Sequence, residues 1–143
     1  MYCRLISSSV LFSALLFFVS CGTPPSLVDL WGVWQGTAAG QDVTVEFRED
    51  GKCVLEFRDI ETGESHRFRG KFQADFTKQP IPVSVRSIPE LPHALHMIIA
   101  FGADGSLYMS QFSTQWRLRP IAFETDKTVK LTRVPQRQSD VIE

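Results

Sequence analysis

Cysteine is scarce in this 143-residue chain, which contains three. So few cysteines do not support the dense disulfide framework of small secreted domains. Neither sign of charge is in excess, because the chain has 15 basic and 16 acidic residues. No run of charged residues is longer than residues 48–50. This balance predicts no nucleic-acid partner. The longest apolar run, residues 10–19, would form a helix of about 15 Å, about half of a bilayer's hydrocarbon thickness.

The short apolar run has the features of an export signal. Arg4 supplies a positive charge before it and Cys21 follows its end. Residues 18–21, Phe-Val-Ser-Cys, resemble the lipobox of bacterial lipoproteins. This resemblance implies a signal peptide over residues 1–20, acylation of Cys21, and a place in the bacterial cell envelope, anchored to a membrane on its periplasmic or surface face. The alternative is ordinary secretory cleavage near residues 20–23, which would leave a soluble periplasmic protein.

The remaining chain has the length of one domain. Loss of residues 1–20 would leave 14 basic and 16 acidic residues, a net charge of −2. Residues 21–27 contain Thr-Pro-Pro-Ser and are interpreted as a short lipidated tether. Residues 28–134 are long enough to bury one modest core. The polar residues 135–143 are expected to form a flexible tail.

Short alternating segments separated by turn signals every eight to twelve residues predict antiparallel strands and no helix. The expected strands cover residues 31–38, 43–48, 53–59, 66–76, 81–86, 95–101, 107–112, 116–123 and 128–134. Consecutive hairpins predict an all-β, up-and-down barrel of about eight strands, because closure removes exposed strand edges. A two-sheet sandwich is the alternative fold.

Three short blocks carry a second resemblance. A Gly-x-Trp motif ends at Trp34, a Gly…Asp-x-Thr-Lys-x-Pro stretch spans residues 70–80, and Arg119 begins an Arg-Pro-x-x-Phe motif before a closing Arg133. In this order they resemble small lipocalin-like domains of exported bacterial proteins. The resemblance implies that Trp34 is buried at the closed end of the barrel with the guanidinium of Arg133 stacked on it, or else that of Arg119.

The expected interior is rich in large apolar side chains. These could pack solid, as short strands favour, or line a pocket for an acyl chain or another small apolar ligand. The candidate lining residues are Phe47, Phe57, Phe68, Phe72, Met97 and Phe101.

Motifs for catalysis or metal binding are missing. His93 and His96 have no third ligand at a zinc-like interval and are expected to be surface or rim histidines. Cys53 is expected to be a small core residue, with a disulfide to Cys21 as the alternative that excludes acylation. No nucleophile motif or phosphate loop is present, so we expect no enzyme, no cofactor and no metal site.

The sequence therefore predicts a lipid-anchored envelope protein with a structural or interaction role. The proline-containing loop over residues 87–93 is a candidate contact for an envelope protein, because loops on rigid scaffolds commonly carry function. Carriage of a small apolar ligand in the barrel is the alternative function.

Overall fold

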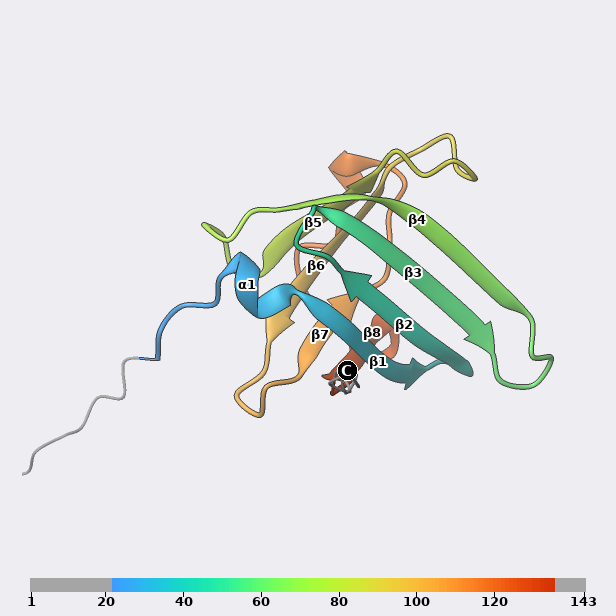
Figure 1. Cartoon of the computed structure of the whole chain (residues 1–143), viewed down its shortest axis with the longest axis horizontal. Coiled ribbons are helices and arrows are strands. Elements are labelled where there is room, and N and C mark those ends of the chain that lie inside the picture. The colour runs from blue at the N-terminus through green and yellow to red at the C-terminus, as the bar shows by residue number, and fades with distance from the viewer. Residues whose placement is uncertain (1–21, 136–143) are drawn as a thin grey trace, which may run out of the picture.

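The computed structural model describes residues 22–135 and consists of one closed, eight-stranded antiparallel barrel (Figure 1). Each strand pairs with the next along the chain, and the last pairs with the first. The strands are β1 (Gly32–Ala38), β2 (Gln41–Phe47), β3 (Lys52–Asp59), β4 (Ser65–Ala74), β5 (Ile81–Arg86), β6 (Leu95–Phe101), β7 (Leu107–Ser110) and β8 (Thr128–Arg133). The prediction of an up-and-down barrel is confirmed, and the sandwich alternative is wrong because β1 and β8 close the ring.

Period-2 alternation places one face of each strand inside the barrel. Along β2, Val43, Val45 and Phe47 are buried, while the residues between them are more exposed. The same pattern along the other strands produces one continuous core. Its largest fully buried side chains are Trp34, Phe47, Leu30, Leu55, Ile81, Met97, Ile99, Leu107, Met109, Leu131, Val45 and Val83.

Two glycines permit close approach of neighbouring strands. A Cβ atom at Gly70 in β4 would lie 2.6 Å from the carbonyl oxygen of Arg86 and 2.8 Å from Cγ1 of Val85. A Cβ atom at Gly36 would overlap the carbonyl oxygen of Lys130 in β8. Glycine at these positions removes the side chain that would otherwise separate the backbones where the sheet curves and closes.

The connection between β7 and β8 differs from its prediction. Residues 116–123 form no strand; η1 (Trp116–Leu118) and η2 (Thr125–Lys127) are short 3-10 turns instead. Trp116, Leu118 and Ile121 are 68%, 67% and 89% exposed, so this segment lacks the buried face that a barrel strand requires. The barrel also closes without residues 116–123, so no strand edge remains with which this segment could pair.

A second difference concerns the N-terminal segment, where no helix was expected. α1 (Leu27–Leu30) is a single helical turn that begins in the predicted tether. The backbone amide and the hydroxyl of Ser26 donate to the carboxylate of Asp29, at 2.7 and 2.9 Å, which stabilises this turn. Within residues 22–135, no helix has the length and apolarity needed to cross a membrane.

Candidate functional site

Trp34 lies at one end of the barrel, which we call the closed end. It is 1% exposed, and its indole Nε1 donates to the carbonyl oxygen of Leu30 at 2.8 Å. The guanidinium carbon of Arg133 lies 4.4 Å from the Trp34 ring centroid. This guanidinium also donates to the carbonyl oxygens of Asp29 and Trp31. Through these contacts Arg133, which lies on the last strand, is linked to the first strand and to α1.

Arg119, the other candidate for this contact, lies elsewhere. Its Nη2 donates to Ser84 on β5 at 2.5 Å, outside the barrel wall. The structure therefore has the contact between Trp34 and Arg133 that the resemblance implies. The alternative contact, with Arg119, is wrong. Trp34 and Arg133 are also directly paired across β1 and β8, which accounts for their proximity.

The N-terminal segment leaves the molecule at the closed end. Residues 23–26 line a hollow of about 600 Å³ together with Trp34, Phe101 and Arg133. In Figure 1, α1 and the segment before it lie at the left, while the β1–β2 and β3–β4 hairpins lie at the right. Cys21 and residues 1–20, like residues 136–143 of the predicted tail, lie outside the described residues.

The six candidate ligand-lining residues do not surround one pocket. Phe47 and Met97 are at most 1% exposed within the packed core. Phe72 packs edge-on against Phe47, with ring centroids 5.0 Å apart. Phe101 packs edge-on against Trp34 at 6.2 Å, at the closed end. Phe47, Phe72 and Met97 therefore fill space in or against the core, whereas Phe101 borders the hollow at the closed end beside the N-terminal segment.

The remaining two aromatic residues lie near the opposite end, which we call the mouth. Phe57 lies 6.4 Å from Phe68 and 5.5 Å from Phe112, measured between ring centroids. Beside Phe57 and Phe112 is a mainly apolar hollow of about 280 Å³, between the β1–β2 hairpin and the start of β8. It is lined by Ala38, Ala39, Gln41, Val43, Phe57, Met109, Ser110, Gln111, Phe112, Asp126, Lys127, Thr128 and Val129. Of the six candidates, only Phe57 lines this hollow.

His96 was expected at the surface or rim, and that prediction is wrong. Its side chain points out of the barrel but is 7% exposed, because residues 111–127 cross over it. Its Nδ1 lies 2.9 Å from the hydroxyl of Ser84 and 3.2 Å from Nη2 of Arg119. Burial, together with the charges of Arg119 and Arg86, lowers the pKa of His96. His93, by contrast, is exposed.

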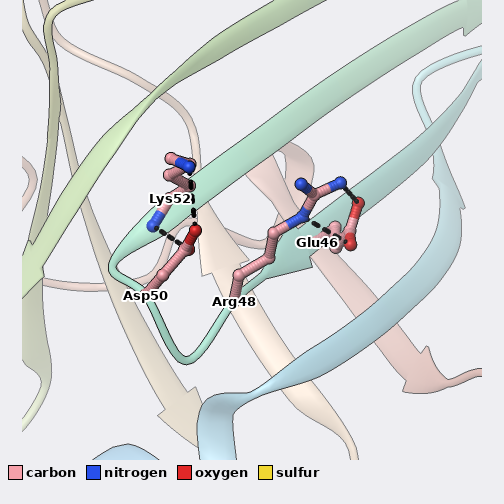
Figure 2. A network of polar contacts seen from close by, with 4 residues as sticks. All are labelled: Glu46, Arg48, Asp50 and Lys52. Atoms are coloured by element: carbon pink, nitrogen blue, oxygen red, sulfur yellow. Dashed lines mark hydrogen bonds and ion pairs between the residues drawn. The ribbon is translucent and has the colours of Figure 1, made fainter.

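Two of the acidic residues near the β2–β3 turn, Glu46 and Asp50, form ion pairs. Arg48 binds the Glu46 carboxylate through Nε at 2.8 Å and Nη2 at 3.2 Å (Figure 2). Asp50 accepts from the amide of Lys52 at 3.0 Å, and the Lys52 ammonium lies 3.0 Å from the same carboxylate. These contacts stabilise a tight turn at which Gly51 has a positive φ of 80°.

Cys53 is a free thiol, 1% exposed, as expected for a small core residue. Burial raises its pKa to about 12, so the nucleophilic thiolate is almost absent at neutral pH. Within residues 22–135, no group of three or more histidine, cysteine, aspartate or glutamate side chains is arranged to hold a metal ion.

Comparison of this chain with family models, curated proteins and solved structures gives no match. The function is therefore inferred from the geometry of the molecule. Its main elements are a closed end next to the N-terminal segment, a packed interior, and an apolar hollow at the mouth.

Proposed function

We propose that this chain is a lipid-anchored protein of the bacterial cell envelope whose barrel serves as a binding domain and not as an enzyme. The position of the N-terminal segment is the main support. It leaves beside Trp34 and Arg133, so an acylated Cys21 would hold the closed end toward the membrane. The mouth, at the other end, would then face away from the membrane and be open to a partner.

The tether length limits how far the barrel can move from the membrane. Five residues, 22–26, separate Cys21 from α1, and an extended chain spans about 3.5 Å per residue. The reach is therefore about 17 Å. Acyl chains contribute about 0.8 kcal/mol per buried methylene, and two or more chains give stable anchoring where one gives only marginal binding.

The chemistry of the described side chains supports a non-enzymatic role. The thiol of Cys53 is buried and protonated. The carboxylates of Glu46 and Asp50 are engaged by neighbouring cations. Ser84 and His96 are within hydrogen-bond distance, but each is at most 7% exposed beneath the β7–β8 connection, so a substrate has little access to them.

Metabolic labelling with an alkyne fatty acid, followed by membrane fractionation, tests the anchor. The wild-type chain should carry the label and sediment with membranes. Cys21→Ser should lose the label and become soluble, whereas the matched control Cys3→Ser should behave like the wild type, because Cys3 lies in the segment that is removed.

Two outcomes would contradict the anchor. Label retained in Cys21→Ser would place the acyl group elsewhere. An unlabelled, soluble wild-type protein would favour simple secretory cleavage and a periplasmic location.

The hollow at the mouth supports a second candidate function, the binding of a small apolar ligand. Its volume of about 280 Å³ is near the lower end of the range for small-molecule sites, about 300–1,000 Å³, and suits part of one acyl chain. Native mass spectrometry of the purified protein should then detect one hydrophobic compound per chain. Met109→Trp, which would fill the hollow, should remove that compound, and its persistence in this variant would exclude the mouth as the site.

A further inference from the structure

The outer surface of β4 and β5 carries a polar hollow of about 390 Å³. It is separate from the core, because Ser84 faces it while Val83 and Val85 on the same strand face inward. The polar residues that line it are Gln73, Asp75, Lys78, Ser84, Arg86 and Arg119.

Positive charge dominates this hollow. Three of its lining residues are cations, Lys78, Arg86 and Arg119, and one is an anion, Asp75. The Asp75 carboxylate already accepts from the amide and hydroxyl of Thr77, at 3.0 and 2.5 Å, and lies 3.4 Å from the Lys78 ammonium. Within the described chain, neither arginine forms an ion pair. The lining therefore carries an excess of two positive charges.

Strand register places further positive charge beside Arg86. Lys71 on β4 is directly opposite Arg86 on β5, and Lys52 on β3 is directly opposite Lys71. These three cations form a row across the outer face. Like charges directly opposite each other in a sheet are destabilising, and among the described residues only Lys52 of these three has a carboxylate partner, Asp50. An anion bound next to Arg86 would reduce this repulsion.

Arg119 is held in place with part of its hydrogen-bonding capacity unused. Its Nη2 donates to Ser84 and lies 3.2 Å from Nδ1 of His96. Its Nε is buried and has no hydrogen-bond partner among the described residues. The lowered pKa of His96 keeps that imidazole neutral near neutral pH, so it accepts from Arg119 and does not repel it. The guanidinium is thus preorganised at the hollow, with no counter-ion between residues 22 and 135.

We propose that this hollow binds a phosphate group. Guanidinium groups match phosphate oxygens with paired N–H donors, and the excess of two positive charges matches a phosphate monoester dianion. The amide of Gln73 adds a neutral polar group to the same wall, and the buried hydroxyl of Ser84 holds Arg119 in place.

The phosphate has two possible sources, a soluble phosphate monoester and a phospholipid headgroup. Trp116, Leu118 and Ile121 are exposed on the connection that carries Arg119. Large apolar side chains next to a cationic site are suited to the membrane interface. The experiment therefore includes one arm for each source.

Isothermal titration of the purified full-length chain with inorganic phosphate, at constant ionic strength, tests the site. We expect saturable binding of one phosphate per chain, weakened about tenfold or more by Arg86→Gln. Arg69→Gln removes the same charge from the same outer face outside the hollow and should change the dissociation constant less than about twofold. Arg86 is the preferred position because it is exposed, whereas Arg119 also supports the β7–β8 connection.

Absence of saturable binding, or equal weakening in the two variants, would overturn the proposal. The second arm uses the full-length Cys21→Ser chain, which has no acyl group at position 21, and compares vesicles with and without phosphatidic acid, because the apolar run of residues 10–19 can associate with both. Binding to phosphatidylcholine vesicles that contain phosphatidic acid, lost in Arg86→Gln, would identify a headgroup. Phosphate binding without vesicle binding would identify a soluble ligand. Because this site is remote from Cys21 in sequence and needs no anchor, its failure would leave the anchoring proposal untouched.

Discussion

The contact between Arg133 and Trp34 should be a measurable source of barrel stability. Arg133→Met keeps most of the aliphatic stem but removes the charge and the N–H donors. The perturbation is confined to the closed end, because Arg133 contacts Trp34 from β8 and donates to the carbonyl oxygens of Asp29 and Trp31 before β1.

The expected loss in the free energy of unfolding of Arg133→Met follows from three contacts. A partly exposed cation over an indole contributes about 0.5–1 kcal/mol. Arg133 itself is exposed, so water can replace its two carbonyl contacts, and we assign them together about 0.5–1 kcal/mol after screening. The expected loss in the free energy of unfolding is therefore about 1–2 kcal/mol. For a domain of this size it corresponds to a fall in Tm of roughly 5–10 °C.

Urea denaturation of a double-mutant cycle measures the contact directly. The cycle comprises wild type, Arg133→Met, Trp34→Leu and the double variant, with Arg69→Met as a surface arginine control. We expect a coupling energy of about 0.5–1 kcal/mol between positions 133 and 34 and little change in the control. A coupling energy near zero would refute the argument that the cation stabilises the closed end through the indole.

Three further predictions concern single side chains. In the mature protein, a thiol reagent should detect no cysteine under native conditions and one, Cys53, in denaturant, because burial raises the pKa of Cys53 to about 12; a reactive native thiol would contradict either its burial or the acylation of Cys21. The pKa of His96 is lowered by folding, so the unfolded chain binds a proton more readily as pH falls through 6.5. Stability should therefore decrease from pH 7 to pH 5 in urea titrations, and less steeply in His96→Gln; an unchanged slope would refute this. Gly70→Ala places a Cβ atom 2.6 Å from the Arg86 carbonyl oxygen and should cost about 1–3 kcal/mol by denaturation. Gly22→Ala, with no atom within 4 Å, should cost nothing, and equal effects would contradict the close packing of β4 on β5.

Most of the barrel could be predicted from local sequence. Alternation such as Val43, Val45 and Phe47 identifies a strand by itself, because successive side chains point to opposite faces. Turns such as residues 49–52 then connect adjacent strands as hairpins. The segment 116–123 was predicted wrongly because its apolar residues have the composition of a strand, and composition does not reveal whether a partner strand is free.

The candidate sites were less predictable, because side chains distant in sequence meet only through strand register. The six proposed lining residues include four that fill the core or the closed end and two near the mouth. The burial of His96 depends on a connection that begins fifteen residues later and folds back over it. The row formed by Lys52, Lys71 and Arg86 was also missed, since each residue alone has the pattern of an ordinary solvent-facing position.

The sequence by itself determined the strand pattern, the hairpin order and the choice of residues able to face inward, because these depend on neighbours a few positions apart. Only the tertiary structure decided that the barrel closes between β1 and β8, that Arg133 and not Arg119 covers Trp34, and that cations from three strands lie in one row. Those outcomes depend on register and ring closure, which bring together groups separated by tens of residues, and no local pattern encodes that distance.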